Sequence, residues 1–259
     1  MEKAIFEAQD ICLNFGGLKA VQNFNLAMAR NELVGLIGPN GAGKTTVFNI
    51  ITGAYKPHQG SLSFRNRQIS GLKSYQISKL GISRTFQNIR LFPGLTVLDN
   101  VLVACHQHTS HTLSDSILRT RKFFWDEKVI REKSLALLAI FGLEQLRDEL
   151  AGNLPYGQQR RLEIVRALAT DPQLLLLDEP AAGMNPQETS SLMQLIKKIR
   201  EQFDLTILLI EHDMKVIMGI CQRILVLDYG VTIAEGPPEQ IRKDPKVIEA
   251  YLGEATQAT

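Results

Sequence analysis

A glycine-rich stretch near the N-terminus has the residue types and spacing that bind a triphosphate. It runs Gly38-Pro39-Asn40-Gly41-Ala42-Gly43-Lys44-Thr45-Thr46 and satisfies the pattern GxxxxGK[ST]. The glycines let the backbone curl so that successive N–H groups point inward, and the helix expected over 46–52 adds its positive dipole end. Lys44 would place its charge on the β- and γ-phosphate oxygens, which leaves the Thr45 hydroxyl to ligate Mg²⁺. We expect nucleoside triphosphate binding rather than a chance turn, because an apolar strand precedes the loop.

Two adjacent carboxylates end an apolar segment later in the chain. Residues 174–177 are four leucines that predict a buried strand, and Asp178-Glu179-Pro180 follows them. Ligands gather at the carboxyl ends of strands in open α/β sheets. One of the two can hold the Mg²⁺ sphere through water while the other polarises the water that attacks the γ-phosphate. We assign the first role to Asp178 and the second to Glu179. Acidic residues also cap strand ends for structural reasons, but beside a phosphate loop the pair indicates a hydrolytic site.

Short apolar runs at 33–37, 174–177, 206–210 and 224–227 predict parallel strands buried in an α/β core. Strand candidates at 4–9 and 26–29, around a turn at Gly16-Gly17, and another near 62–64 predict an antiparallel β layer. From about 98 to 142 the apolar residues follow a helical period, which predicts an inserted helical subdomain. We place 1–90 and 165–259 in the core with its β layer, and 91–164 in the helical subdomain.

The composition excludes several classes of protein. The chain has 259 residues, 44% hydrophobic and 22% charged, and its charges sum to 29 − 27 = +2, so disorder, collagen and coiled coil are excluded and nucleic acid is not indicated as a partner. No apolar run approaches the roughly 18 residues that span a bilayer, and no secretory signal is visible, so we expect a cytosolic chain. Cys12, Cys105 and Cys221 are odd in number and far apart, which indicates reduced packing residues.

Further motifs make the chain resemble the ATP-binding cassette (ABC) family over nearly its whole length. The stretch Leu154-Pro155-Tyr156-Gly157-Gln158-Gln159-Arg160-Arg161 is similar to the family signature. Gln87 in Arg84-Thr85-Phe86-Gln87 resembles the glutamine loop, and His212 in Glu211-His212-Asp213 resembles the switch histidine. The resemblance implies one ABC ATPase domain over 1–259. It also implies the P-loop NTPase fold of that family: a RecA-like parallel-sheet core, an antiparallel β layer, and a helical subdomain that carries the signature.

Each of these residues has a chemical role to offer and a plainer alternative. Phe15 would present an aromatic face to adenine, although alone it would more often belong to the core. Gln87 would offer an oxygen to Mg²⁺ or to the attacking water, and His212 would contact the γ-phosphate. Without the other motifs, a glutamine in a loop would simply be solvated. A histidine after a buried strand would have its hydrogen bonds satisfied by structural partners.

The signature departs from the family pattern, since Pro155 replaces the usual serine and Tyr156 the first glycine. One hydroxyl is thereby lost, but Tyr156, Gly157 and Gln158 can still present a helix start to a phosphate. The alternative is an ordinary helix N-terminus with a basic, solvated face at Arg160, Arg161 and Arg166. Asn185, in Ala181-Ala182-Gly183-Met184-Asn185-Pro186, stands where the family often has aspartate.

Within the family the chain looks like the longer of the two ATPase subunits of branched-chain amino-acid importers. That resemblance implies ATP hydrolysis in a dimer with a second ATPase subunit, identical or not. It implies membrane permease subunits that dock on 88–104, where Leu91, Phe92 and Leu95 are otherwise local core. It also implies an extracytoplasmic substrate-binding protein as indirect partner and a peripheral place on the cytoplasmic face of the inner membrane. The alternatives are another ABC ATPase, such as one for lipopolysaccharide export, and a soluble nucleotide switch, although the guanine motif of GTPases is missing.

The insert at 105–132 carries two clusters that the family motifs do not explain. His106, His108 and His111 lie near Cys105, but their spacing does not suit a zinc site. A basic and aromatic cluster follows, which could contact RNA or lipid. Its members are Arg119, Arg121, Lys122, Phe123, Phe124 and Trp125. We expect instead a helix that buries its aromatic residues on one side.

Overall fold

The computed structural model describes residues 4–108 and 113–257, and the chain forms two compact units. The first unit comprises Met1–Arg84 and Gln173–Thr259, and the second comprises Thr85–Pro172. The boundaries between the two units therefore lie at 84/85 and at 172/173. The sequence predicted these boundaries near 90 and 165. No helix of the described ranges is long and apolar enough to span a bilayer.

An antiparallel sheet forms the N-terminal part of the first unit, as predicted. Its order is β2-β1-β4-β5, with bounds β1 Phe6–Phe15, β2 Leu18–Met28, β4 Gln59–Phe64 and β5 Arg67–Gln68. The strands β1 and β2 run much further than the predicted 4–9 and 26–29. Their register shifts near Asp10 and Asn23, which have left-handed backbone φ angles of 49° and 46°. Such bulges interrupt the alternation by which strands are found in a sequence.

A second sheet of six strands forms the rest of the framework, in the order β10-β9-β3-β8-β7-β6. Its bounds are β3 Leu33–Ile37, β6 Ile82–Arg84, β7 Leu174–Asp178, β8 Thr206–Ile210, β9 Arg223–Asp228 and β10 Val231–Gly236. The strands β9, β3, β8, β7 and β6 are parallel, and β10 is antiparallel to β9. The four predicted strands are confirmed. The sequence missed β6, which has three residues, and β10, which is only partly buried.

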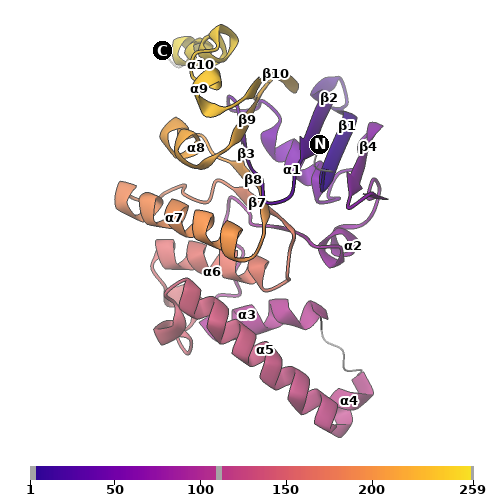
Figure 1. Ribbon diagram of the computed structural model, residues 1–259, viewed down its shortest axis with the longest axis vertical. Helices are drawn as coiled ribbons and strands as arrows, with labels where there is room; N and C mark the ends of the chain where they lie inside the picture. Colours follow the sequence, from indigo (N-terminus) through magenta and orange to yellow (C-terminus); the bar gives the residue numbers. More distant parts are fainter. Residues whose placement is uncertain (1–3, 109–112, 258–259) are drawn as a thin grey trace. The chain divides into compact units, whose positions relative to one another are not determined.

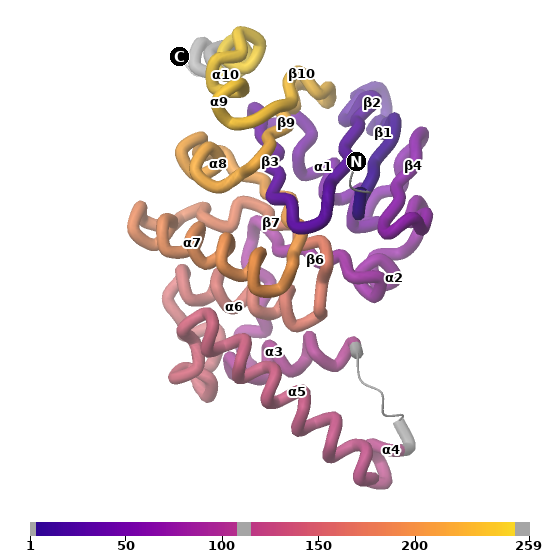
Figure 2. The backbone as a smooth tube through the Cα atoms, in the orientation of Figure 1, coloured from indigo at the N-terminus to yellow at the C-terminus, as the bar shows by residue number. Residues whose placement is uncertain are grey.

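The helices of the first unit are α1 Lys44–Ile51, α2 Ser74–Lys79, α7 Pro186–Gln202, α8 Met214–Ile220, α9 Pro238–Ile241 and α10 Pro245–Gln257 (Figure 1, Figure 2). One apolar core joins side chains of both sheets with those of α1, including Phe6, Phe24 and Phe48. Asn185 caps α7 by accepting from the N–H groups of Gln187 (3.0 Å) and Glu188 (2.9 Å). A neutral asparagine is therefore sufficient for this cap.

The second unit is helical, as predicted for the insert. Its elements are α3 Val97–Cys105, η1 His106–His108, α4 Leu113–Leu118, α5 Arg121–Ile140, η2 Glu144–Leu146, η3 Ala151–Asn153 and α6 Tyr156–Leu168. Side chains of α3, α5 and α6 form its core, among them Val101, Leu138 and Leu162, which are fully buried. In α5 the buried residues begin only at Ile130. The part of this helix before Ile130 therefore contributes no buried side chain.

Candidate nucleotide-binding and hydrolysis site

The phosphate loop links β3 to α1, as the sequence predicted. A Cβ atom at Gly38, where φ is 149°, would lie 2.0 Å from the Leu227 carbonyl oxygen. At Gly43, where φ is 105°, it would lie 2.6 Å from the Ala20 carbonyl oxygen. Both positions therefore require glycine. Thr45 and Thr46 lie in the first turn of α1, which has no acidic residue and, within the described chain, no side-chain cap.

Lys44 folds back over the loop that it follows. Its Nζ donates to the carbonyl oxygens of Gly38 (2.6 Å) and Pro39 (2.8 Å), and the residue is 8% exposed. A buried ammonium must be well partnered. The two loop carbonyls are among its partners. They hold the ammonium group at the N-terminus of α1, where a phosphate would lie.

A cavity of about 570 Å³ borders the phosphate loop. Pro39, Asn40, Gly41 and Ala42 form one wall, and Leu18 also lines it. Its remaining lining residues are Asp228, Tyr229, Ile233, Lys246, Glu249 and Ala250, from the β9–β10 region and α10. This volume is within the range of small-molecule sites.

The ends of three adjacent parallel strands bring the chemical groups to one edge of the sheet. The strand β3 leads into the phosphate loop, and β8 leads into Glu211 and His212. The strand β7 ends at Asp178 and is followed by Glu179. Since β8 lies between β3 and β7, the histidine segment lies between the loop and the carboxylates. This is the edge at which α/β sheets bind ligands.

Asp178 is buried and paired with an arginine. It is 1% exposed, and Arg84 Nη2 lies 2.6 Å from its Oδ2. Arg84 Nη1 also donates to Asn49 Oδ1 at 2.6 Å, and its guanidinium lies over the Phe48 ring, 5.3 Å from the centroid. The sequence did not predict this pair, because Arg84 ends the short strand β6 that it missed.

Glu179 has a strained backbone and lies beside the predicted histidine. Its φ is 46°, in the left-handed region, and its N–H donates to the Ile210 carbonyl at 2.9 Å. His212 Nδ1 lies 3.6 Å from Glu179 Oε2. The His212 side chain is 63% exposed and that of Glu179 17%. Strained residues of this kind cluster at active sites.

Glu211 is a second carboxylate that the sequence did not single out. It is 1% exposed, and its Oε1 accepts the Ala181 N–H at 2.8 Å. Burial raises the pKa of this carboxyl, which the Ala181 N–H opposes and the nearby Glu179 reinforces. Glu211 therefore ties the segment after β8 to the segment after Glu179. Its signal in the sequence is an acid at the end of a buried parallel strand.

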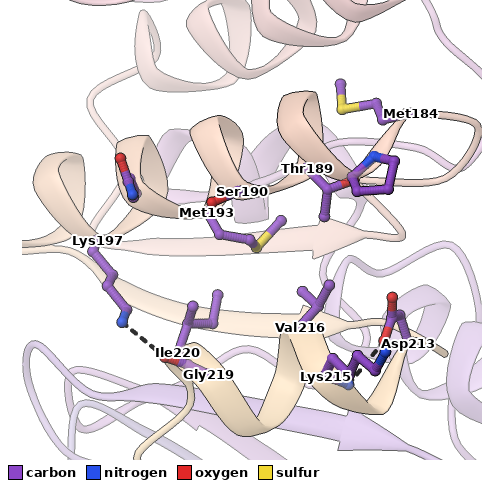
Figure 3. Close-up of a pocket in the computed structure, with 12 residues that line it drawn as sticks. Met184, Thr189, Ser190, Met193, Lys197, Asp213, Lys215, Val216, Gly219 and Ile220 are labelled. Atoms are coloured by element: carbon purple, nitrogen blue, oxygen red, sulfur yellow. Dashed lines mark hydrogen bonds between the residues drawn. The ribbon is translucent and has the colours of Figure 1, made fainter.

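A groove of about 530 Å³ lies between α7 and α8, the helices that follow these two segments (Figure 3). Met184, Met193 and Val216 line it, and Lys197 Nζ donates to the Gly219 carbonyl at 2.7 Å. Glu179 and His212 do not line it. The groove is therefore separate from the residues to which the sequence assigned chemistry.

Phe15 ends β1 and is exposed rather than part of the core. Its ring is 45% exposed and makes an edge contact with Tyr55, with 5.3 Å between centroids. The structure thus rules out the alternative that Phe15 is a core residue. Its face remains accessible to a planar ligand.

The remaining predicted site residues belong to the second unit. Gln87 is exposed and lies in the loop after Thr85. Arg160 fixes the backbone of this loop, because Nη1 donates to the Phe86 carbonyl and Nη2 to the Gln87 carbonyl, both at 2.6 Å. Arg160 also binds Glu163 Oε2 at 2.8 Å.

The signature residues Tyr156, Gly157 and Gln158 form the first turn of α6. Tyr156 is 44% exposed, and its hydroxyl accepts from Arg160 Nη2 at 3.1 Å. The alternative of a wholly solvated basic face is wrong, since Arg160 is 0% exposed. The guanidinium turns inward because Glu163 and two backbone carbonyls offer it acceptors.

The insert differs from expectation in its aromatic residues. Phe124 is 58% exposed and Trp125 67%, so the prediction that this cluster buries its aromatic side chains is wrong. The physical reason is that α5 runs past the helices that would cover it. His106 Nε2 lies 3.9 Å from Glu127 Oε1, and His111 lies outside the described residues. Within 4–108 and 113–257 no group of three His, Cys, Asp or Glu is placed to hold a metal.

The oxygen donors proposed for Mg²⁺ have suitable chemistry. Thr45 is exposed at the start of α1, Asp178 offers a carboxylate, and Gln87 offers an amide oxygen. Mg²⁺ prefers such hard oxygen ligands. Thr45 and Asp178 belong to the first unit and Gln87 to the second.

Two models of known protein families match parts of the chain. A family model described as "ABC transporter" matches residues 21–182, and one described as "Branched-chain amino acid ATP-binding cassette transporter" matches residues 231–256. The chain is 48% identical over 255 residues to the high-affinity branched-chain amino acid transport ATP-binding protein LivG of Escherichia coli (strain K12). That alignment covers 98% of this chain and 100% of the relative.

A more distant relative is the lipopolysaccharide export system ATP-binding protein LptB of Haemophilus influenzae. It is 34% identical over 251 residues, with 97% of this chain and 98% of the relative covered. Among solved structures, the ADP conformation of an ATP-binding cassette of an ABC transporter has a TM-score of 0.84 and 30% identity. It covers 96% of this chain and 99% of its own. The chain therefore belongs to the ABC transporter family, as one of its ATP-binding cassettes.

Proposed function

We propose that this chain is the ATP-binding and ATP-hydrolysing subunit of a membrane importer of branched-chain amino acids. The observation that carries the proposal is the gathering of its chemical groups at one edge of the parallel sheet. Lys44 lies beyond β3 and His212 beyond β8, while Asp178 ends β7 and Glu179 follows it. A cation for phosphates, a carboxylate base and a metal ligand are the parts that phosphoryl transfer to water requires.

The phosphate loop and Phe15 hold the nucleotide. The loop Gly38-Pro39-Asn40-Gly41-Ala42-Gly43-Lys44-Thr45-Thr46 surrounds the β- and γ-phosphates and presents backbone N–H groups from all of its residues except Pro39, which has none. Lys44 Nζ exchanges its contacts with the Gly38 and Pro39 carbonyls for phosphate oxygens. Phe15 stacks on adenine, which contributes about 1 kcal/mol. The 45% exposure of Phe15 supports this role.

Glu179 acts as the general base. Its carboxylate takes a proton from water while the water oxygen forms a bond to the γ-phosphorus, and the bond from that phosphorus to the bridging oxygen breaks to give ADP and phosphate. His212, 3.6 Å from Glu179, contacts the γ-phosphate and orients the carboxylate. Thr45, Asp178 and Gln87 would hold Mg²⁺, which neutralises charge on the β- and γ-oxygens when bound.

Hydrolysis occurs in a dimer with a second ATPase subunit. Each ATP lies between the phosphate loop of one cassette and Tyr156, Gly157 and Gln158 of the other. The start of α6 suits this task because its first-turn N–H groups point along the helix axis. Loss of the γ-phosphate removes the bridge between the subunits, and the cycle of closing and opening drives transport.

Membrane permease subunits dock on residues 88–104. Phe92 is 45% exposed and Leu95 37%. Asn100 fixes the backbone of Phe92, accepting its N–H at 2.9 Å and donating to its carbonyl at 3.0 Å. The Arg166 guanidinium lies over the Phe92 ring, 4.8 Å from the centroid. A rigidly presented apolar ring of this kind is a suitable anchor for a partner helix.

The transported substrate is a branched-chain amino acid. Identity to the LivG relative is 48%, against 34% for the lipopolysaccharide exporter subunit, and residues 231–256 match the branched-chain model. By this resemblance an extracytoplasmic substrate-binding protein delivers the amino acid to the permease. The cassette itself is peripheral, at the cytoplasmic face of the inner membrane.

The ATPase proposal is tested on the purified chain with Lys44→Ala and Glu179→Gln. We expect Lys44→Ala to lose most nucleotide affinity. Glu179→Gln should bind ATP, hydrolyse it at least about a hundredfold more slowly, and accumulate as a nucleotide-bound dimer. Equilibrium ATP binding, phosphate release and sedimentation measure the three properties. Lys198→Ala and Glu201→Gln are matched surface controls. Unchanged hydrolysis in Glu179→Gln would remove Glu179 from the role of base.

The substrate is tested in cells that lack the gene. We expect uptake of labelled leucine, isoleucine and valine to fall, and to return with the wild-type gene but not with Glu179→Gln. Lipopolysaccharide at the outer surface should be unaltered. Normal amino-acid uptake together with retained lipopolysaccharide inside the cell would assign the chain to export instead.

The docking surface is tested with Phe92→Asp. The expected result is loss of permease association and of transport, while the isolated variant hydrolyses ATP at the wild-type rate. Phe203→Asp is the control, because Phe203 is similarly exposed (39%) but lies in the first unit. Transport at the wild-type rate in Phe92→Asp would contradict docking on 88–104.

A further inference from the structure

An exposed apolar and basic surface occupies the corner between α4 and α5 in the second unit. Ile117 is 73% exposed, Leu118 74%, Phe124 58% and Trp125 67%. Arg119, Arg121 and Lys122 lie among them and are also exposed. We call these seven residues the insert tip. Large apolar side chains concentrated in this way mark an interaction site.

The exposure is built into the local fold. Arg119 has a left-handed φ of 47°, which turns the chain sharply between the two helices. Thr120 caps α5 by accepting the Phe123 N–H at 3.4 Å, and its hydroxyl donates to Asp115 Oδ1 at 3.1 Å. The first buried residue of α5 is Ile130, so no part of the unit's core lies under the insert tip. The corner is therefore an ordered projection of the second unit, with α4 at the N-terminal end of α5 (Figure 1).

The charges of the insert tip are of one sign. From residue 116 to residue 125 the chain has three basic residues and no acidic one. Asp115 and Asp126 flank this stretch and are partly buried. Tryptophan and phenylalanine beside aliphatic and basic side chains form the composition of segments that lie in a membrane interface. Arginines at such a surface complement anionic headgroups.

We propose that the insert tip binds the anionic lipid surface of a membrane. Ile117, Leu118, Phe124 and Trp125 enter the headgroup region, and Arg119 and Arg121 contact lipid phosphates. Lipid is favoured over RNA because Ile117 and Leu118, the most exposed members, have no ring on which a base can stack. The near-neutral net charge of +2 also lacks the overall basic excess of a nucleic-acid binder.

This proposal goes beyond the proposed function and gives the insert a task of its own. A cassette with this contact has a second attachment to the bilayer, in addition to its permease. Binding to lipid requires neither ATP nor a permease. Lipid binding can therefore be absent while ATP hydrolysis and transport are retained. Conversely, ATP hydrolysis or transport can be absent while lipid binding is retained.

The chain offers a direct reporter, because Trp125 is its one tryptophan. We expect its emission to shift to the blue, and iodide quenching to weaken, when the full chain meets vesicles of phosphatidylglycerol and phosphatidylethanolamine. Vesicles of phosphatidylcholine alone should give a much smaller change. No shift with either, or equal shifts with both, would overturn the proposal.

Two double variants keep Trp125 and change the surface around it. Ile117→Glu with Leu118→Glu, and Arg119→Glu with Arg121→Glu, should each weaken co-sedimentation with anionic vesicles on the order of tenfold or more. Arg242→Glu with Lys243→Glu, in the segment that follows α9, is the charge-matched control. Circular dichroism and ATPase rate verify folding. Wild-type vesicle binding by both tip variants would overturn the proposal.

Binding of RNA or of a protein at the insert tip would give different results. A Trp125 shift with single-stranded RNA and none with vesicles would assign the surface to nucleic acid. A shift that appears only with the permease in detergent, without lipid vesicles, would assign it to protein docking. Either result would replace the membrane proposal.

Discussion

At the scale of single residues, the Arg84–Asp178 pair is the most sensitive point of the site. Its side chains are 6% and 2% exposed. Removing one partner of a buried pair leaves an uncompensated charge, which costs about 3–5 kcal/mol. We therefore expect Arg84→Gln to lower the free energy of unfolding of the first unit by that amount, measured by urea denaturation.

The control for Arg84→Gln is a surface pair of the same unit. Arg30 Nη2 lies 3.1 Å from Asp204 Oδ2, with side chains 66% and 53% exposed. Exposed pairs contribute about 0–1 kcal/mol. Arg30→Gln should thus have almost no effect. Equal effects of the two substitutions would show that Asp178 does not depend on Arg84.

Glu211 predicts a dependence of stability on pH. Because burial raises its pKa above the usual 4.5, the folded chain binds this proton more readily than the unfolded chain. Stability from this group is therefore present below pH 4.5 and is lost as pH rises through the raised pKa. Glu211→Gln keeps an oxygen for the Ala181 N–H but does not titrate. Its stability relative to wild type should therefore rise as the pH increases above 4.5.

The measurement for Glu211→Gln is the urea midpoint across that pH range. Glu201→Gln serves as the control, since it is the same substitution on a side chain that is 69% exposed. A difference between Glu211→Gln and wild type that does not change with pH would contradict a raised pKa for this carboxyl.

At the scale of elements, α6 depends on a buried pair within one helical turn. Arg160 and Glu163 are 0% and 4% exposed, and Glu163 also accepts the N–H groups of Phe86 and Arg90. Arg160→Met should destabilise the second unit by about 3–5 kcal/mol, because Glu163 is left buried without its cation. Adding Glu163→Leu should recover part of that loss. Denaturation of wild type, Arg160→Met, Glu163→Leu and the double variant completes the cycle. A double variant no more stable than Arg160→Met would contradict the pairing.

The elements also show what the sequence can and cannot predict. Continuous apolar strands such as β3, β7 and β8 were placed within a residue, because burial on both faces removes polar positions. The lengths of β1 and β2 were not, since the bulges at Asp10 and Asn23 disturb the alternation. Likewise, the pairing of Asp178 with Arg84 was not predicted. It depends on β6 lying beside β7, and these two strands are far apart in the sequence. The phosphate loop needed only local spacing, so it was predicted in full.

At the scale of the whole molecule, each unit has its own apolar core. We therefore expect a core substitution in one unit to loosen that unit first. Leu138→Ala in α5 should cost about 2–5 kcal/mol and speed amide hydrogen exchange across 85–172. Leu175→Ala in β7 is the reciprocal variant and should affect the sheet of the first unit. Exchange that rises equally in both units for either variant would contradict separate cores.

The left-handed backbone of Glu179 has a consequence for the protein's history. A non-glycine residue in this conformation is destabilising by about 1–2 kcal/mol, and glycine or asparagine is not penalised to the same degree. Glu179→Gly or Glu179→Asn would therefore fold as well as wild type or better while losing the carboxylate that we propose as the base. Stability and activity make opposing demands at this position, and a cassette that no longer had to hydrolyse ATP would be free to lose its glutamate there.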